Sequence, residues 1–559
     1  MLRAALLVTT LLFASDLAAQ EATLREGRSV GGSLAEGDTV RYTLEVQDDY
    51  FVYGEVDQMS VDLIVRLLGE DGAQLARIDR SERGPEIFTG DLDDGGRYQI
   101  QVIAAEDATG DFEITLHRAE PVETNPGKLV DQFMAPYDRE DAPGAAVQVW
   151  RDGRTIFSKA YGMANLSYGI PFEVDTRTNI GSTSKQFTAF AIMLQAQRGK
   201  LSLDDDIRTH IPELPEFDET ITVRHIITHT SGLREFLNLL RMAGRRLDHC
   251  DYIGRDELIE IVRRQPALQN APGTEWNYNN TAFGLAALIV ERTSGQDFHE
   301  FMAENVFGPI GMARTMVRPS PEHIVPERSE GYTPARDGFR EIGDLGGAVG
   351  AGGIYSTVED LQTWVENYHD PRVGSREIFD EMMTSYVLAN GDSTNYGYGL
   401  GVGRHRGLRR VSHNGADVAH RSNLVYYPEI NAGITVQSNH AGFNSGIATR
   451  FAEAFFADAM EPVEADVASA TRDFDPESYD AEDVDEMVGR YALDNAPTFI
   501  LTFTREGETL FTQATGQQRL EIVPTSDSTF ALSAVTAEVT FHRNDDGDID
   551  GATLDQNGQ

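Results

Sequence analysis

The 559-residue sequence has a single cysteine, and its N-terminal hydrophobic run is short. A lone cysteine, Cys250, excludes an intramolecular disulfide, so the folded chain depends on its buried cores for stability. The hydrophobic run covers residues 4–14, which is too short to cross a bilayer as a helix. We therefore expect no stable membrane insertion.

Positive charge is also scarce. The chain has 90 Asp and Glu against 47 Lys and Arg, which gives a formal net charge of −43. A field this negative repels phosphate backbones, so we expect no nucleic-acid partner. Arginine supplies nearly all of the basic residues, and a motif that needs lysine therefore stands out. The lysines are Lys128, Lys159, Lys185 and Lys200.

The first residues have the order of a secretory signal peptide. Arg3 precedes the apolar run, and the small residues Ala18 and Ala19 follow it. This order predicts that residues 1–19 are removed on export and that the mature protein is periplasmic or extracellular. The alternative is a buried or frayed N-terminal helix.

The remaining chain is long enough for several domains. Residues 26–118 alternate apolar and polar side chains between closely spaced turns, which predicts an antiparallel β-sandwich. This stretch resembles the pre-peptidase C-terminal type of sandwich and contains no nucleophile–base set, so we interpret it as an accessory domain. Residues 128–460 mix strands and helices, residues 461–486 are typical of an acidic linker, and residues 487–559 return to short strands.

The first candidate for chemistry is the motif from Ser182 to Lys185, which precedes a helical pattern. One helical turn separates the two side chains, so the amine can reach the hydroxyl. A lysine with a lowered pKa can accept the serine proton, and a helix N-terminus offers N–H groups to an oxyanion. The alternative is a helix cap followed by a solvated lysine.

Two further short motifs follow along the chain. Tyr278 and Asn280, in a loop that enters a helix, offer a phenolic proton carrier and an amide that orients a carbonyl. His413, Gly415 and Ala416 precede a strand-like segment, where glycine permits close backbone approach and the N–H of Ala416 is a candidate oxyanion donor. Taken alone, each motif is better explained as ordinary loop or surface structure.

In this order, Ser-x-x-Lys, Tyr-x-Asn and His-x-Gly match the three-element arrangement of the penicillin-recognising serine hydrolases. Residues 143–147, 222–233 and 352–357 are similar to connecting segments of the same family. Residues 128–460 thus resemble the class C β-lactamase-like family, which includes esterases, D-aminopeptidases, penicillin-binding proteins and class C β-lactamases. The last stretch, 487–559, resembles the lipocalin-like barrel appended to some members.

The resemblance implies an α+β multi-domain protein. Its parts are an N-terminal β-sandwich, a central β-lactamase/transpeptidase-like domain and a C-terminal lipocalin-like β-barrel. The central domain would have an antiparallel sheet flanked by helices, plus a helical subdomain. No cofactor and no metal is implied.

The resemblance also implies roles in acyl transfer. Ser182 would be the acylated nucleophile, Lys185 its base and Tyr278 the proton carrier. Asn280 would contact the substrate or Lys185. The candidate residues are Ser182, Lys185 and Tyr278 for catalysis, and Asn280, His413, Gly415 and Ala416 for substrate binding.

We expect an exported serine hydrolase that acts on a small-molecule ester, amide or peptide. Many β-lactamases of this group carry Lys-Thr-Gly where this chain has His413-Asn414-Gly415, and a neutral imidazole binds a carboxylate less strongly. This departure is similar to the pattern of family esterases and D-aminopeptidases and counts against efficient β-lactam hydrolysis. The alternatives are a D-aminopeptidase, a penicillin-binding DD-carboxypeptidase or β-lactamase, and, from another class, a non-catalytic wall-binding or partner-binding protein. The oligomeric state stays open.

Three other signals favour structural explanations. His225 and His229 are spaced i, i+4, but the glutamate of a zinc-protease helix is missing. The glycine-rich residues 346–353 lack dinucleotide-binding spacing, and close backbone approach at the floor of the site explains them better. Residues 544–550 lack the closing glutamate of a calcium loop, which favours a hairpin turn.

Overall fold

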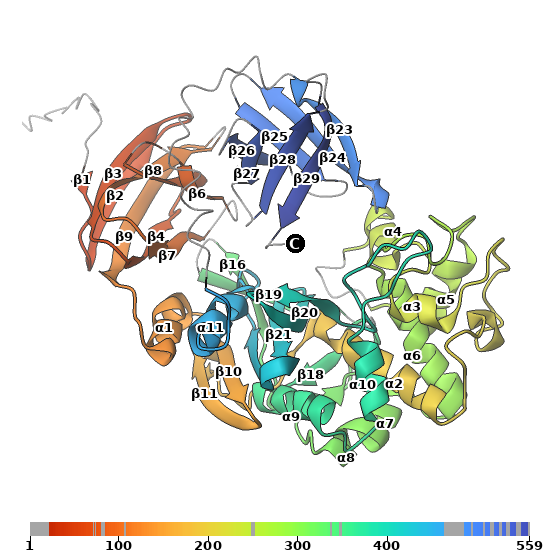
Figure 1. Ribbon diagram of the computed structural model, residues 1–559. Coiled ribbons are helices and arrows are strands. Elements are labelled where there is room, and N and C mark those ends of the chain that lie inside the picture. The colour runs from red at the N-terminus through yellow and green to blue at the C-terminus, as the bar shows by residue number, and fades with distance from the viewer. Residues whose placement is uncertain are drawn as a thin grey trace, which may run out of the picture. The chain divides into compact units, whose positions relative to one another are not determined.

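The chain divides into two compact units, Met1–Pro121 and Val122–Gln559. The computed structural model describes residues 22–70, 72, 74–79, 84–105, 108–246, 252–335, 338–345, 349–462, 486–493, 496–506, 509–514, 519–524, 528–532, 537–543 and 549–556 (Figure 1). The predicted signal peptide, Cys250 and nearly all of the predicted linker lie outside these residues. Within them, no helix is long and apolar enough to cross a membrane.

The first unit is built from two sheets that share one core. A five-stranded sheet has the order β1-β3-β8-β5-β6, and a four-stranded sheet has the order β2-β9-β4-β7. Side chains alternate along β8, so that Ile100 and Val102 face inward against Val56 and Ile114 of the other sheet. The strands are β1 Ala22–Thr23, β2 Arg28–Leu34, β3 Thr39–Val46, β4 Tyr50–Asp57, β5 Leu63–Leu68, β6 Gln74–Ile78, β7 Pro85–Leu92, β8 Gly96–Ala104 and β9 Gly110–Pro121.

A six-stranded antiparallel sheet organises the second unit. Its order is β11-β10-β22-β21-β20-β19, so the first and last parts of the domain pair at its centre. The strands are β10 Ala145–Arg151, β11 Arg154–Tyr161, β19 Gly401–His405, β20 Leu408–Asp417, β21 His420–Tyr427 and β22 Ala432–Ser438. Smaller pairings are made by β12 Met163–Asn165, β13 Ile170–Pro171, β14 Thr178–Asn179, β15 Met316–Val317, β16 Gly331–Ala335, β17 Gly338–Ile342 and β18 Ile354–Ser356.

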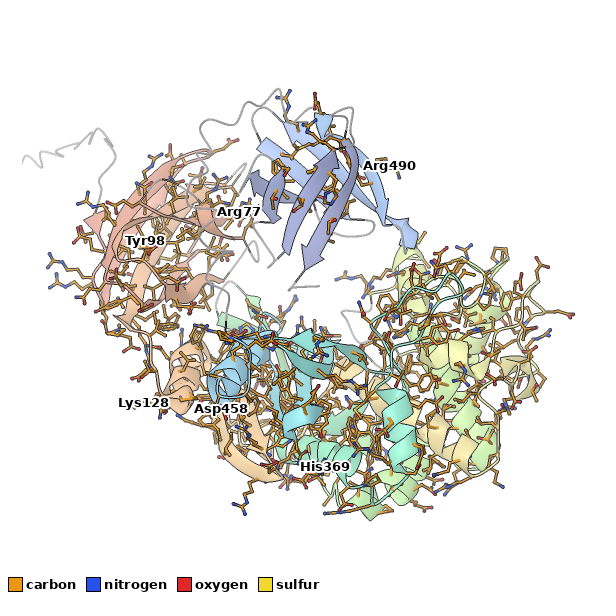
Figure 2. The ribbon with its side chains drawn as sticks, viewed as in Figure 1. Arg77, Tyr98, Lys128, His369, Asp458 and Arg490 are labelled. Carbon is orange, nitrogen blue, oxygen red and sulfur yellow. The ribbon has the colours of Figure 1, made fainter. Side chains whose placement is uncertain are left out.

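Helices cover both faces of this sheet. On β10, Val147 and Val149 pack in one cluster with residues of α1 (Pro126–Phe133) and α11 (Ile447–Phe456), which lie side by side in Figure 1. The alternate residue Trp150 joins the larger core on the opposite face. Asp458, labelled in Figure 2, forms an ion pair with Arg151 at the end of β10, with 2.9 Å between nitrogen and oxygen.

The larger core contains the helices that carry the candidate site. Here α2 packs against α6 and α10, and α9 packs on β10 and β22. Of these helices, α2 and α6 are buried on nearly all sides, because other elements of the core surround them. The helices are α2 Lys185–Gln197, α3 Val223–Ile227, α4 Phe236–Met242, α5 Arg255–Arg263, α6 Asn280–Ser294, α7 Phe298–Met302, α8 Gly308–Ile310, α9 Val358–His369 and α10 Arg376–Met382.

The C-terminal strands form a seven-stranded antiparallel meander in sequence order, not the closed barrel we expected. Among the described residues, no pairing joins the first strand to the last. Closure depends on that non-local pairing, which strand patterns in the sequence do not encode. The strands are β23 Gly489–Leu493, β24 Ala496–Glu506, β25 Thr509–Ala514, β26 Arg519–Pro524, β27 Thr529–Leu532, β28 Ala537–Arg543 and β29 Ile549–Gln556.

The buried side chain of Trp364 in α9 provides a test of how this core is packed. Its side chain is 0% exposed, its ring lies 4.4 Å from that of Phe187, and its Nε1–H donates to Gln186 Oε1 at 2.7 Å. We expect Trp364→Ala to lower the free energy of unfolding by about 3–5 kcal/mol, because it leaves a large cavity. Urea unfolding followed by circular dichroism measures this.

The matched control is Tyr168→Ala, because the Tyr168 side chain is 82% exposed. We expect this change to stay within about 0.5 kcal/mol of the unaltered protein. Equal effects of the two substitutions would contradict the packing described for α9.

Candidate active site

Residues 181–184 carry the candidate nucleophile Ser182, and we call them the nucleophile turn. They lie between β14 and α2. Residues Gly181–Ser184 form a 3-10 turn that continues directly into α2 at Lys185. Ser182 and Lys185 are therefore one turn apart, and Lys185 Nζ lies 2.9 Å from Ser182 Oγ. Ser182 is partly exposed, whereas Lys185 is fully buried. A substrate can thus reach the hydroxyl but not the amine.

Lys185 is held by acceptors from three separate segments. Besides Ser182, its Nζ donates to Asn280 Oδ1 at 2.8 Å and to the carbonyl oxygen of Ala351 at 2.9 Å. Burial lowers the pKa of Lys185 to about 7, and the negative charge of Glu235 opposes part of this shift. A substantial fraction of this lysine is therefore a neutral amine near neutral pH.

Tyr278 and Asn280 flank the start of α6. The side chain of Asn279 caps the helix by accepting the Ala282 N–H, which places Asn280 in the first turn beside Lys185. Lys185 Nζ lies 4.7 Å from the centre of the Tyr278 ring. Burial raises the pKa of Tyr278 above its usual value, so its phenol stays protonated, and the nearby Ser182 side chain opposes part of the rise.

The edge of β20 meets the nucleophile turn backbone to backbone. A Cβ on Gly415 would lie 2.0 Å from the Ile180 carbonyl oxygen, and one on Gly181 would lie 2.7 Å from the backbone of Ala416. Thr183 Oγ1 also donates to the His413 carbonyl at 3.1 Å. The structure thus brings Gly415 and Ala416 against the turn that carries the serine.

His413 is a neutral group in this site. Its Nδ1–H donates to the Asn414 carbonyl at 2.6 Å, and its Nε2 lies 3.0 Å from the Tyr396 hydroxyl, which donates to it. Burial, and then the charge of Lys185, lower the pKa of His413 to about 3. His413 therefore presents no positive charge to a substrate carboxylate.

Glu235 is the carboxylate beside this group, and our sequence reasoning missed it. It caps α4, where its Oε2 accepts the Asn238 N–H at 2.8 Å. Burial raises the pKa of Glu235, while its contacts with Asn238, Asn280 and Lys185 lower it in part. Its Oε1 is buried, and none of the described residues donates to it with the distance and angle of a hydrogen bond.

We expected structural roles for the glycine-rich residues 346–353 and for His225 and His229. Ala351 lies in the glycine-rich segment, and its contact with Lys185 agrees with close backbone approach at the floor of the site. The two histidines set aside for zinc have structural partners, because His225 Nδ1 accepts the Thr222 N–H and His229 Nδ1 accepts the Asn279 N–H. Among the described residues, no group of three or more potential ligands is arranged to hold a metal.

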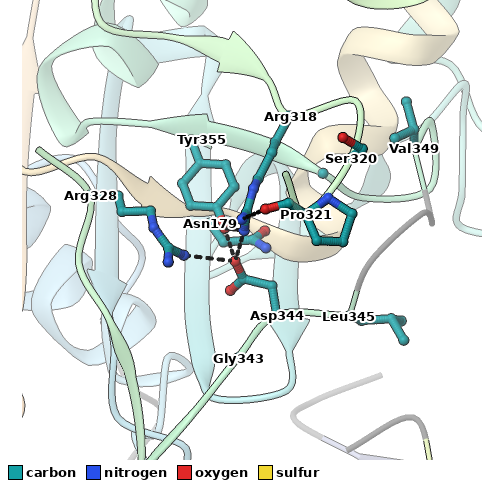
Figure 3. A pocket seen from close by; sticks show the side chains of 11 residues that line it. Asn179, Arg318, Ser320, Pro321, Arg328, Gly343, Asp344, Leu345, Val349 and Tyr355 are labelled. Atoms are coloured by element: carbon teal, nitrogen blue, oxygen red, sulfur yellow. Dashed lines mark hydrogen bonds and ion pairs between the residues drawn. The ribbon is translucent and has the colours of Figure 1, made fainter. Parts of the chain in front are cut away.

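A second polar cluster surrounds Asp344 (Figure 3). Asp344 forms ion pairs with Arg318 at 2.8 Å and Arg328 at 3.2 Å, at the wall of a cavity of about 130 Å³ that Asn179 also lines. Asn179 Oδ1 accepts the Gly181 N–H at 2.9 Å. None of the candidate site residues lines this cavity, so we interpret the cluster as support for the nucleophile turn.

The sequence and the fold of this chain are similar to those of known proteins. The sequence profile of the family described as Beta-lactamase matches residues 127–458. The chain belongs to the Beta-lactamase family of serine hydrolases. This confirms the family that the order of the three motifs predicted, and the central domain of this Beta-lactamase family member has the β-lactamase/transpeptidase-like fold.

The chain is 26% identical to "Penicillin-binding protein 4*" of Bacillus subtilis (strain 168) over 413 residues, which is 70% of this chain and 89% of the relative. It is 26% identical to a D-aminopeptidase of Gluconobacter oxydans (strain 621H) over 303 residues, 54% of this chain and 57% of the relative. The octameric penicillin-binding protein homologue from Pyrococcus abyssi has a similar fold, with a TM-score of 0.55, 24% identity, and coverage of 75% of this chain and 96% of that one.

The lowered pKa of Lys185 predicts how the activity of this Beta-lactamase family member depends on pH. The neutral amine, which can accept a proton, increases as the pH rises through about 7. We expect kcat/KM for a 4-nitrophenyl ester to rise with pH and to fall about tenfold per pH unit below that value. A pH–rate profile between about pH 5 and 9 measures this.

The control for this profile is Lys200→Met, which removes an exposed lysine outside the site. We expect its profile to match that of the unaltered protein. A rate that is flat across neutral pH, or that rises only near the usual pKa of lysine, would contradict a lowered pKa at Lys185.

Proposed function

We propose that this protein hydrolyses a small ester or amide through an acyl-enzyme on Ser182. The observation that carries the proposal is the 2.9 Å contact between Ser182 Oγ and the buried Lys185 amine. Serine needs a neighbouring base to become a nucleophile, and a lysine with a lowered pKa is such a base. Tyr278, Asn280 and the edge of β20 surround the same pair.

The hydrogen bonds of Lys185 support a direction for the first proton transfer. A neutral amine has two N–H groups and one lone pair. The N–H groups suit the Asn280 and Ala351 oxygens, which only accept, and the lone pair then faces the Ser182 hydroxyl. Ser182 Oγ attacks the substrate carbonyl while its proton passes to Lys185.

The later steps follow from the groups that remain. The backbone N–H groups of Ser182 and Ala416 would stabilise the oxyanion. As the carbonyl bond to the leaving group breaks, the proton on Lys185 passes to that group through the phenol of Tyr278. Water then attacks the acyl-enzyme by the same proton path, which releases the acid and restores the serine hydroxyl.

A second candidate substrate class is a D-amino-acid amide or small peptide with a free amine. Glu235 favours it, because a buried carboxylate oxygen without a full hydrogen bond is stabilised by an ammonium group. The relatives named D-aminopeptidase support the same assignment. The neutral His413 counts against a penicillin-binding carboxypeptidase or β-lactamase that recognises a carboxylate through a fixed cation.

Several expectations about the whole protein stay proposals. The N-terminal sequence supports export to the periplasm or beyond, and the first unit would be an accessory domain. The meander of β23–β29 is compatible with a lipocalin-like module. The partners would be small molecules, with no nucleic acid. The competing proposal is a wall-binding protein that keeps the fold without turnover.

Labelling of the intact protein with a fluorophosphonate tests the nucleophile. We expect one covalent adduct by intact mass, and none in Ser182→Ala, because the attacking oxygen is gone. We expect Lys185→Met to slow labelling by about 10²–10⁴-fold, the usual contribution of a general base. Ser184→Ala, next to the site, is the matched control and should label normally.

An adduct that persists in Ser182→Ala would remove Ser182 from the mechanism. Binding of a wall fragment without labelling or turnover of any ester or amide would favour the non-catalytic alternative.

The substitution Glu235→Gln tests the substrate class. If Glu235 binds an ammonium, kcat/KM for D-phenylalanine amide should fall about 10–100-fold, the usual contribution of a charge-assisted hydrogen bond. Hydrolysis of 4-nitrophenyl acetate should change less than about threefold, since that substrate has no amine. Both substrates are assayed on the same preparations of each protein.

Two controls accompany this test. Glu219→Gln removes an exposed carboxylate from the same unit, and N-acetyl-D-phenylalanine amide lacks the ammonium. Equal losses on the ester and the free amide would assign Glu235 to the support of Lys185 and not to substrate recognition.

A further inference from the structure

His229 lies in the turn that follows α3 and is completely buried beside Tyr278. Its backbone has φ +61, the left-handed region that side-chain-bearing residues rarely adopt. Among residues with side chains, histidine enters this region more often than most, as asparagine and aspartate do. The turn therefore accommodates a histidine, whose role is set by the contacts of its side chain.

The hydrogen bonds of His229 fix its proton. Nδ1 lies 3.0 Å from the backbone nitrogen of Asn279, and a backbone N–H can only donate, so Nδ1 is an unprotonated acceptor. The ring is then neutral with its hydrogen on Nε2, where it has no hydrogen-bond partner among the described residues. Burial and the nearby Lys185 keep the pKa of His229 well below its usual value, which agrees with this form.

The same residue holds the chain on both sides of Tyr278. The carbonyl oxygen of His229 accepts the Asn277 N–H at 2.8 Å, and its ring accepts the Asn279 N–H. Between these two bonds, the Tyr278 ring lies against the imidazole, with 4.3 Å between ring centres and 38° between planes. The backbone carbonyl of His229 thus holds Asn277, and the His229 side chain holds Asn279 and the Tyr278 ring.

The surroundings of the imidazole hold it in turn. Its ring centre lies 4.8 Å from that of Tyr396 and 4.9 Å from that of Phe283. Phe283 belongs to α6, and Tyr396 also hydrogen-bonds His413. The imidazole is therefore fixed by groups that belong to the site and to the helix beneath it.

We propose that His229 is a positioning residue that holds the Tyr278 hydroxyl at Ser182, through its Nδ1 bond to Asn279 and its ring contact with Tyr278. The inference rests on the proposed role of Tyr278 as proton carrier. His229 itself touches neither the substrate nor the reacting atoms. Its contribution should appear in the rate of the chemical steps and not in binding.

The test compares two substitutions that both tolerate a positive φ. His229→Asn keeps an acceptor at the position of Nδ1, whereas His229→Gly removes both the acceptor and the ring. With 4-nitrophenyl acetate as substrate, we expect His229→Gly to lower kcat by about 10²-fold, the effect of misplacing a catalytic group by about 1 Å. We expect KM to stay within about threefold and His229→Asn to keep at least about one fifth of kcat.

The same substitutions are repeated in a Tyr278→Phe background. If His229 acts through the Tyr278 hydroxyl, His229→Gly should lower kcat by less than about a further threefold once that hydroxyl is absent. Thermal melting of all variants shows that each is folded at the assay temperature. Should the glycine variant not fold, His229→Ala, which also removes the acceptor and the ring, takes its place: a kcat loss near 10²-fold that His229→Asn does not share supports the proposal, and equal kcat values for the two variants overturn it.

The outcomes separate this inference from the proposal on which it rests. If Tyr278→Phe is slow and adding His229→Gly still lowers kcat by about 10²-fold, only the role of His229 is overturned. A Tyr278→Phe protein with an unaltered rate would overturn the role of Tyr278 and this inference together. Labelling of Ser182 by the fluorophosphonate would still report on the nucleophile in both cases.

Discussion

Burial of the Lys185 amine is the constraint to which the rest of the site conforms. A charged ammonium in a dry interior costs several kcal/mol, so the protein either pairs it or lets it lose its proton. Here the acceptors come from the nucleophile turn, from α6 and from the segment around Ala351. These three segments must therefore be locked together before the lysine has its lowered pKa.

The packing of α2 against α6 provides that lock. Gly350 lies so close to α6 that a Cβ would be 2.5 Å from the Phe283 carbonyl oxygen, which brings Ala351 within reach of the amine. On the opposite side, a Cβ on Gly399 would lie 2.7 Å from the Lys185 carbonyl oxygen. Backbone-to-backbone contact thus holds both the segment around Ala351 and the first turn of α2 in place. The same tight fit recurs where β20 meets the nucleophile turn.

Few charged groups lie near Lys185, although the chain as a whole is strongly acidic. His229 and His413 are both neutral and both lie near Lys185, so neither adds a positive charge that would hinder protonation of the amine. Glu235 is the carboxylate whose charge reaches Lys185 and Tyr278. Chemistry at this site is therefore governed by a few groups, whereas the net charge of −43 concerns solvation.

What the sequence alone determined is local. One helical turn between Ser182 and Lys185, the loop that enters a helix at Asn280 and the glycine at 415 each follow from short-range rules, and the order of these motifs identified the family. Tertiary structure decided what depends on residues distant in sequence. It brought in Glu235 and His229, and it placed Lys185 in a dry interior where its pKa falls to about 7, because burial and long-range contacts, unlike spacing, exist only once the chain has folded.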